Sequence, residues 1–193
     1  LQPCVTNIQT FRTTHPTDGL PVVFVDTPGS DDETWSVRDI LSKIAAWLVK
    51  SYAEKVDLAA VIYLHRISDN RMGGLELKNL QEFEKSCGQQ RMSNVIIATT
   101  MWNNVRQETG VRREEELKTS FWKGMVDNGC RTERFEETYE SAWFIIGSLA
   151  DRAKMQVPIR WEIIDVQQSS KEHNANIVPQ DRERPFPFRK LFS

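Results

Sequence analysis

Three uninterrupted apolar runs constrain the fold of this 193-residue chain more than any other feature. They span residues 22–25, 58–64 and 95–98, and they consist mainly of valine, isoleucine, leucine and alanine. Short runs without a polar break are typical of strands buried on both faces, as in a parallel sheet covered by helices. We therefore expect an α/β fold of three layers, in which helices cover both faces of a mostly parallel sheet.

Segments with helical periodicity lie between and after these runs. Apolar side chains recur every three or four positions over residues 37–52, 75–87, 114–128 and 137–154, which predicts four amphipathic helices. Three consecutive acidic residues, 114–116, would then lie in the first turn of the third helix and complement its dipole. Because strands alternate with helices, this order along the chain is typical of a mainly parallel sheet.

Two further strands are expected outside this alternation. Residues 5–11 alternate loosely between apolar and polar side chains, and a turn-rich stretch separates them from the run at 22–25. Since no helix lies between the strand at 5–11 and the strand at 22–25, these two should form an antiparallel pair at one end of the sheet. A short last strand is expected at residues 131–135.

The composition indicates one domain and excludes several classes of protein. A net charge of −2 leaves no large basic surface for nucleic acid or membrane lipid. The apolar segments are too short, and too interrupted by charge, to span a bilayer. The three cysteines are far apart, so they predict neither a metal site nor a disulfide framework, and we expect a cytoplasmic location. We expect one domain over residues 1–166, followed by a polar, Pro-rich tail over residues 167–193.

Polar side chains follow each apolar run at its carboxyl end. Asp26 follows the first run, His65 the second, and Asn103 comes soon after the third. In a parallel sheet these ends meet at one edge, where open α/β folds bind their ligands, so we expect the three side chains to line one crevice. A catalytic role for His65 is the alternative, since histidine in general serves as an acid or base, but no Ser or Cys nucleophile is paired with it, so a hydrogen-bonded loop residue is the favoured role.

Three sequence motifs carry a resemblance to a known family. They are VVFVDTPGSDD at residues 22–32, YLHRISDNRM at 63–72 and VIIATTMW at 95–102. With these motifs the chain resembles P-loop GTPases of the septin-related and immune-associated type, and most closely the G domains of fungal proteins, over about residues 1–150. The resemblance implies a G-domain fold that binds GTP and Mg²⁺.

The resemblance assigns the phosphate side of the site to residues near the first run. Asp26 is implied to hold Mg²⁺, usually through water, and Gly29 to place its amide against the γ-phosphate. Residues 30–34 would form the mobile switch. Thr6 is implied as a further Mg²⁺ ligand, although Val5 aligns equally well with the switch threonine of the family. A plain strand followed by a turn, without function, stays open as the alternative for this segment.

The resemblance assigns the base side of the site to Thr100, Trp102 and Asn103. Together with Met101 they occupy the place of the family's [N/T]-K-x-D loop, whose Asp accepts two hydrogen bonds from guanine. An amide has one acceptor oxygen and an NH₂ group that would face a donor, so Asn103 departs from the pattern where guanine is selected. Met101 departs as well, because it replaces the lysine whose stem covers the base. The preference for guanine is therefore open.

The phosphate-binding motif G-x-x-x-x-G-K-[S/T] occurs nowhere in the 193 residues. In the family this loop and the strand before it would lie upstream of Leu1, so we expect a G domain that is truncated at its N-terminus. The missing strand would lie between the strands at 20–26 and 58–64, and its loss would leave backbone groups unpaired. We therefore expect low stability and little nucleotide binding for these residues alone.

Two functions stay open on the sequence. The first is a GTP-binding domain that, in its intact parent, binds GTP with Mg²⁺ and hydrolyses it slowly as a molecular switch, with its catalytic residue unidentified. The second is a nucleotide-free pseudo-GTPase that acts as a protein-interaction module, which the absent loop and Asn103 favour. By analogy with relatives, the first function would include a homodimer formed through the nucleotide face.

Overall fold

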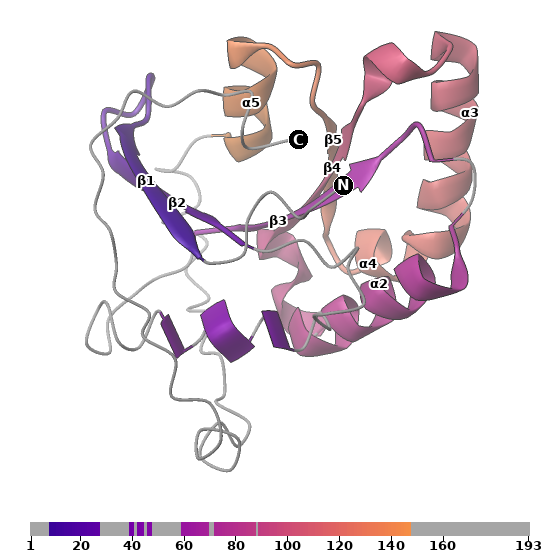
Figure 1. The fold of residues 1–193 in the computed structure, drawn as a ribbon, viewed down its shortest axis with the longest axis horizontal. Helices are drawn as coiled ribbons and strands as arrows, with labels where there is room; N and C mark the ends of the chain where they lie inside the picture. Colours follow the sequence, from indigo (N-terminus) through magenta and orange to yellow (C-terminus); the bar gives the residue numbers. More distant parts are fainter. Residues whose placement is uncertain are drawn as a thin grey trace. The chain divides into compact units, whose positions relative to one another are not determined.

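The computed structural model divides the chain into two compact units. One unit carries strands β1 and β2, and the other carries the turn at 15–18 and the elements from β3 to α5 (Figure 1). The residues that the structure describes are 8–27, 39–40, 42–44, 46–47, 59–69, 72–87 and 89–147. The described pieces of 39–47 are helical, as expected. The rest of the expected helix at 37–52 and the expected tail at 167–193 lie outside the described residues.

An antiparallel hairpin forms the strand structure of the first unit. Strand β1 (Gln9–Thr14) pairs with β2 (Pro21–Asp26) along the whole length of both, and Gln9 lies opposite Asp26. The antiparallel pairing is confirmed, but β1 continues to Thr14, beyond the expected end at 11, while the expected start at 5–7 lies outside the described residues. Threonine side chains late in β1 favour extended backbone and prolong the pairing, a signal that the apolar alternation does not contain.

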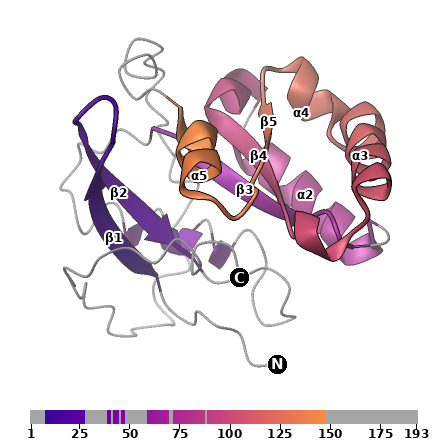
Figure 2. The same cartoon turned by 90° about the horizontal axis from the view of Figure 1, so that it is seen from above.

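A three-stranded parallel sheet in the order β3–β4–β5 forms the centre of the second unit (Figure 2). Its strands are β3 (Val61–Arg66), β4 (Val95–Thr100) and β5 (Arg131–Arg134). Every residue of the central strand β4 is buried, as its apolar sequence predicts. The register places Arg66 opposite Thr100 and Thr99 opposite Arg134, so the three carboxyl ends lie in one row.

Helices cover both faces of this parallel sheet. The elements are α2 (Gly74–Cys87), α3 (Gln107–Glu116), a π-helical turn (Leu117–Phe121), α4 (Lys123–Asp127) and α5 (Tyr139–Ile146), with 3-10 turns at Gln89–Asn94 and Trp102–Asn104. On one face, Ile145 of α5 packs in a buried cluster with Ile96 and Ala98 of β4. On the other face, the Phe83 ring of α2 lies 5.0 Å from the Tyr63 ring of β3, between ring centroids.

Helix α5 is shorter than the helix expected at 137–154. It begins with a reciprocal cap, in which the Ser141 backbone N–H donates to the Thr138 hydroxyl and the Thr138 backbone N–H donates to the Ser141 hydroxyl. It ends before Gly147, whose φ of 64° lies in the left-handed region that glycine adopts at no steric cost. The residues after Gly147 in the expected helix lie outside the described residues.

Helix α3 starts earlier than the helix expected at 114–128. It begins at Gln107. The sequence did not reveal this start, because the seven residues before Glu114 contain few apolar side chains and so show no helical periodicity. The acidic residues 114–116 therefore end α3 rather than begin it, and the expected role in complementing the helix dipole is wrong. Glu108 occupies the first turn instead, where an acid is favourable. The expected stop at Gly129 is confirmed, since α4 ends just before it.

The structure confirms a mixed α/β fold with a parallel sheet between helices, while the finer assignment to the G-domain type stays a prediction. Among the described strands, β2 pairs only with β1, and β3 pairs only with β4, so the hairpin and the parallel sheet are separate. Strand β2 is also less buried than expected, with Val23 37% exposed. None of the described helices combines the length and the apolar character that crossing a membrane requires.

Candidate functional site

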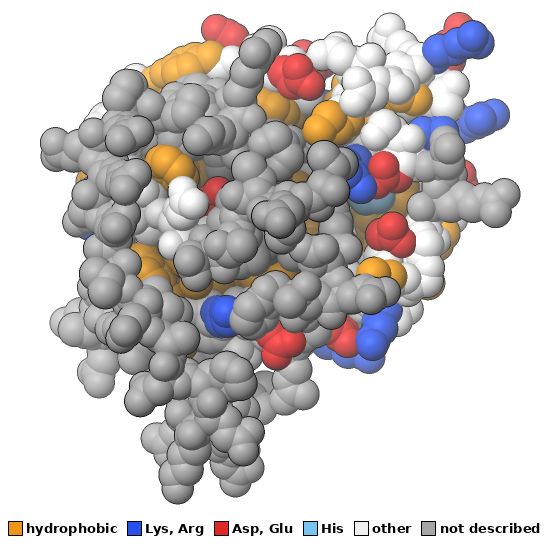
Figure 3. Space-filling model, in the orientation of Figure 1, with side chains coloured by type: hydrophobic (Ala, Val, Ile, Leu, Met, Phe, Trp, Pro, Cys, Tyr) orange, Lys and Arg blue, Asp and Glu red, His pale blue; other side chains and the backbone are white. Residues whose placement is uncertain are grey.

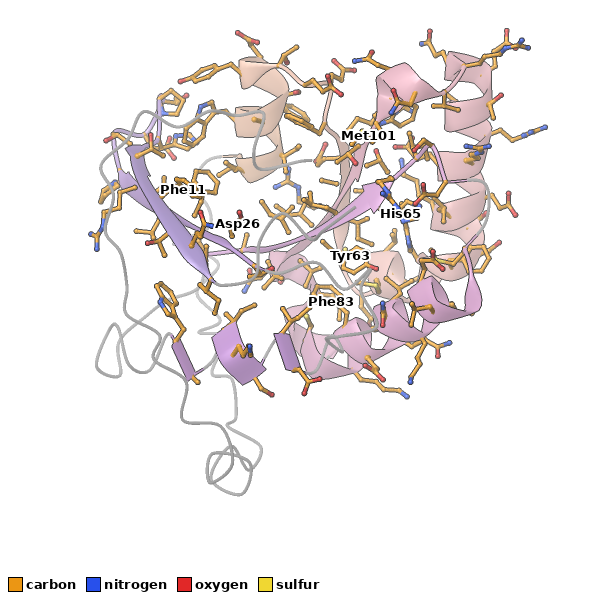
Figure 4. The ribbon with its side chains drawn as sticks, in the orientation of Figure 1. Phe11, Asp26, Tyr63, His65, Phe83 and Met101 are labelled. Carbon is orange, nitrogen blue, oxygen red and sulfur yellow. The ribbon has the colours of Figure 1, made fainter. Side chains whose placement is uncertain are left out.

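The carboxyl edge of the parallel sheet gathers the candidate residues of the second unit. His65 and Arg66 end β3, and Met101 begins the loop that follows β4 at the same end of the sheet (Figure 4). The Thr100 hydroxyl donates to the His65 carbonyl oxygen at 3.5 Å, which joins the two strand ends. The His65 ring lies edge-on to the buried Trp122 ring, with 5.3 Å between centroids. His65 is therefore a packed residue within β3, and the expectation that it lies in a loop is wrong.

Two residues at this edge have left-handed backbone although neither is glycine. Met101, with a φ of 60°, directly follows β4, and Glu137, with a φ of 59°, lies in the loop between β5 and α5. This conformation costs about 1–3 kcal/mol per residue and persists only where the surrounding structure enforces it. The two loops are therefore held in defined shapes, which is what a binding edge requires.

Trp102 anchors the loop that follows β4. Its indole N–H donates to the Thr99 hydroxyl at 3.0 Å and to the Thr99 carbonyl oxygen at 3.3 Å. Gly110 of α3 packs against the indole, and a Cβ at that position would lie 2.7 Å from the ring, closer than side chains tolerate. Trp102 therefore directs its one hydrogen-bond donor into the sheet and fixes the turn that carries Asn103.

A largely buried ion pair lies next to this anchor. Arg134, at the end of β5, donates through Nε to both carboxylate oxygens of Glu114 at 3.1 Å, and Glu114 is 4% exposed. The Lys118 ammonium lies 3.3 Å from the same carboxylate, and the Thr99 hydroxyl donates to it at 3.4 Å. The Arg134 guanidinium also lies 4.3 Å above the Trp102 ring, in a cation–π contact. One network therefore joins α3, β4 and β5.

The electrostatics of this network keep Glu114 ionised. Burial by itself raises the pKa of Glu114, but hydrogen bonds from Arg134 and the positive charges of Lys118 and Arg134 lower it below its ordinary value. The hydrogen bond to Glu114 in turn raises the pKa of Arg134. Because the Glu114 oxygens are already occupied by these donors, the carboxylate is suited to holding the loop rather than to binding a cation.

Of the residues expected to contact the base, Asn103 is the exposed one. Thr100 is 3% exposed and donates to His65, while Trp102 is partly buried under Arg134. Asn103 lies in the 3-10 turn after Met101, on the solvent side of this anchored loop. Thr100 and Trp102 therefore position the loop, and Asn103 is the member whose side chain is available to a ligand.

The residues expected on the phosphate side belong to the other unit or lie outside the described residues. Asp26 ends β2, within the first unit. Thr6, Gly29 and the expected switch at 30–34 lie outside the described residues. Because Asp26 and Asn103 belong to different units, their common cleft stays a prediction.

Asp26 is a partly buried carboxylate without a cation beside it among the described residues. Burial raises its pKa above the ordinary value, opposed by a hydrogen bond from the Thr27 backbone N–H, and no cation contributes. The described part of the chain holds no group of three or more His, Cys, Asp or Glu that could bind a metal by itself. Nucleotide-bound Mg²⁺ needs no such group, since it takes one or two carboxylates and completes its shell with waters and phosphates.

A cavity of about 550 Å³ opens beside the ion pair. Its walls come from the end of β5, the loop that follows it, the start of α5, Glu114 at the end of α3 and Lys118 of the π-helical turn. They include Glu114, Arg134, Glu136, Thr138, Glu140 and Phe144. We call this space the β5–α5 cavity.

Sequence reasoning missed the pair of Glu114 and Arg134. It searched for polar residues after apolar strands, whereas β5 has the polar sequence RTER. Once α3 begins at Gln107, Glu114 falls on the same helix face as Gly110 and Leu117, which are buried. A carboxylate on a buried face requires a cation, so a correct helix start would have predicted the ion pair.

No protein-family model matches the chain, and no curated protein matches it either. The resemblance to P-loop GTPases therefore rests on the sequence motifs alone, and a function has to be argued from the residues of the site.

Proposed function

We propose that this chain contributes the base-binding part of a guanine-nucleotide-binding domain similar in kind to P-loop GTPases. The observation that carries the proposal is the loop after the central parallel strand, in which Trp102 is anchored and Asn103 is exposed. Parallel α/β sheets bind ligands outside the carboxyl ends of their strands. A rigid loop with an exposed amide at that edge is suited to the hydrogen-bonding edge of a nucleobase.

In this proposal some residues hold the loop in place, and one residue contacts the base. Trp102 and the ion pair of Glu114 with Arg134 hold the backbone in place, so little conformational entropy is lost when a base binds. The Asn103 amide oxygen would accept one hydrogen bond from guanine. A carboxylate would accept two, so the preference for guanine is expected to be weak in this chain.

The phosphate side of the proposal involves Asp26, Gly29 and Thr6. Asp26 would hold Mg²⁺, with Thr6 as a further ligand, and the Gly29 amide would contact the γ-phosphate. Mg²⁺, when bound, would neutralise charge on the phosphate oxygens. The intact parent would then hydrolyse GTP slowly, by attack of water on the γ-phosphate, and act as a molecular switch. The partly buried Asp26 carboxylate, without a cation of its own, supports this assignment.

A second candidate is a nucleotide-free domain that binds another protein. Two observations favour it: an amide stands at position 103, and Arg134 covers one face of the Trp102 ring. In this case the anchored loop would be a rigid contact surface rather than a base pocket. The two candidates make different predictions for a free nucleoside. The base-binding candidate predicts that it perturbs the loop of Trp102 and Asn103, and the protein-binding candidate predicts that it does not.

Titration with phosphate-free nucleosides tests the base-binding part by itself. Guanosine and adenosine are added to the full chain, and NMR shifts of the Trp102 indole N–H and the Asn103 side-chain amide are followed. We expect guanosine to shift both signals weakly, at millimolar concentration. Asn103→Asp should strengthen guanosine binding by about tenfold and leave adenosine unchanged, because a carboxylate accepts both donors of guanine.

Asn104→Asp is the matched control, since Asn104 is exposed in the same turn but is not the residue of the family pattern. It should leave guanosine binding within about twofold of the parent chain. If neither nucleoside shifts the loop in any of the three proteins, the base-binding proposal fails and the protein-interaction candidate is favoured.

A further inference from the structure

The β5–α5 cavity has an acidic wall whose charges are only partly neutralised. Glu114 is paired with Arg134 and Lys118, as described above. Glu136 and Glu140 are exposed, and no ion pair within the described residues involves either of them, although the charge of Glu136 contributes to the raised pKa of Arg134. Lys118 and Arg134 are the two cations of the lining, against four carboxylates: Glu114, Glu133, Glu136 and Glu140. Exposed carboxylates around one cavity repel each other and attract a cationic ligand.

A large aromatic side chain borders the same cavity. Phe144 of α5 lines it and is 67% exposed, the highest exposure among the large apolar side chains described. The neighbouring positions Ala142 and Ile145 are buried on the sheet side of the helix, so Phe144 lies on the outer side. Hydrophobic and acidic side chains lie next to one another over α5 (Figure 3). This combination suits a ligand that carries both positive charge and apolar rings.

The chain itself contains a segment of that chemistry. Residues 184–192 read RPFPFRKLF, with three cations, three phenylalanines and no acid. The prolines restrict the unbound backbone, so binding orders fewer bonds. The chain between Gly147 and Arg184 spans up to about 3.3–3.6 Å per residue, which is ample to reach a cavity on α5.

We propose that residues 184–192 dock into the β5–α5 cavity of the same molecule. Arg189 and Lys190 pair with Glu136 and Glu140, and a phenylalanine ring of the segment covers Phe144. A tethered segment has an effective concentration in the millimolar range, which favours it over a second copy of the chain in dilute solution. The inference is independent of nucleotide binding, because none of these residues belongs to the proposed base site.

Zero-length carbodiimide cross-linking of the full chain tests this contact directly. Monomeric protein at low concentration is treated, digested and examined by mass spectrometry for an amide between Lys190 and Glu136 or Glu140. We expect this cross-link within single molecules, reduced in high salt because the contact is ionic. Lys171 is the internal control, since no phenylalanine lies near it in the sequence, and it should give at most traces of the same cross-links.

Hydrogen exchange of the full chain gives a second readout that needs no reagent. In the double variant Glu136→Gln with Glu140→Gln, exchange of the amides in residues 184–192 should become roughly threefold to tenfold faster, because two exposed ion pairs are lost. The matched control is Glu115→Gln with Glu116→Gln, which removes two exposed carboxylates from α3 outside the cavity and should change nothing.

Three results would overturn the proposal. Cross-links found only between two chains would show that a second copy occupies the cavity. Equal cross-linking of Lys171 and Lys190 would show unspecific attraction. Equal exchange rates of residues 184–192 in the parent and both double variants would show that Glu136 and Glu140 do not hold the segment.

Discussion

Glu114, beside the carboxyl edge of the parallel sheet, and Asp26, at the end of the hairpin strand β2, are both shielded from water, yet their pKa values move in opposite directions. Burial acts to raise both pKa values, but only Glu114 has cations beside it, and these reverse the shift. The opposite directions of the two pKa shifts distinguish a carboxylate that is paired with cations in the fold from one that is not. Glu114 is part of the scaffold, whereas Asp26 has a hydrogen bond from the Thr27 backbone N–H and no cation beside it among the described residues.

Strands β4 and β2 show the same contrast in their apolar side chains. Both were expected to be buried on both faces, because each contains a run of apolar residues. Val95 of β4 is 1% exposed, whereas Val23 of β2 is 37% exposed. Strand β4 has a partner strand on each side and helices on both faces, while β2 has one partner strand among the described residues. The number of strands and helices packed around a strand, rather than its apolar sequence alone, therefore decides how far its side chains are buried.

Replacing Arg134 should produce the largest effect, because it removes the principal partner of a buried charge. Arg134→Met keeps an apolar stem near Trp102 but leaves Glu114 with Lys118 as its one cation among the described residues, beside the hydrogen bond from Thr99. We expect the free energy of unfolding to fall by about 3 kcal/mol in urea denaturation, at the low end for a broken buried pair because the Arg134 side chain is 37% exposed. The exposed Arg112→Met is the control, with a change below about 0.5 kcal/mol.

The pH dependence of Arg134→Met distinguishes lost pairing from lost packing. Because the folded pKa of Glu114 lies below its ordinary value of 4.5, its contribution to stability is complete above that pH and is lost as the pH falls through the folded pKa. The variant should therefore lose less stability on acidification than the parent. A parallel pair of pH profiles would contradict a charge-based role for Arg134.

Matched valine substitutions should sharpen the contrast between the two strands, with an intermediate effect. Val95→Ala removes two methyl groups from a closed core, so we expect the free energy of unfolding to fall by about 2 kcal/mol. Val23→Ala removes the same atoms from a partly exposed strand and should cost less than about 0.5 kcal/mol. Both are measured by urea denaturation, and equal losses would show that β2 is as closed as β4.

Periodicity and apolar runs predicted the elements that depend on one local signal, such as β4 and the glycine that follows α4. They failed where the deciding partner is distant in sequence. The apolar periodicity placed Glu114 at a helix start, and its partner Arg134 lies on a polar strand that no apolar run marks. The candidate site shows the same limit. The position of Asn103 after β4 could be predicted from the local sequence, but the packing of Trp102 against Gly110 of α3 could not.

Asp26→Asn should produce the smallest effect, and one of opposite sign. Because burial raises the folded pKa of Asp26 above its ordinary value of 3.8, its favourable contribution is complete below that pH and is lost as the pH rises through the folded pKa. At neutral pH the charged form is therefore unfavourable, and the amide should raise the free energy of unfolding by less than about 1 kcal/mol, since the side chain is only partly buried.

Urea denaturation at neutral and acidic pH checks this expectation, because the gain should vanish where the parent carboxyl is protonated. A variant that is less stable than the parent at neutral pH would mean that Asp26 has a stabilising partner. A carboxylate that destabilises the free protein is what a cation-binding position requires, since the bound cation supplies the missing charge. The stabilised variant would then be the one that loses the Mg²⁺ proposed for this position.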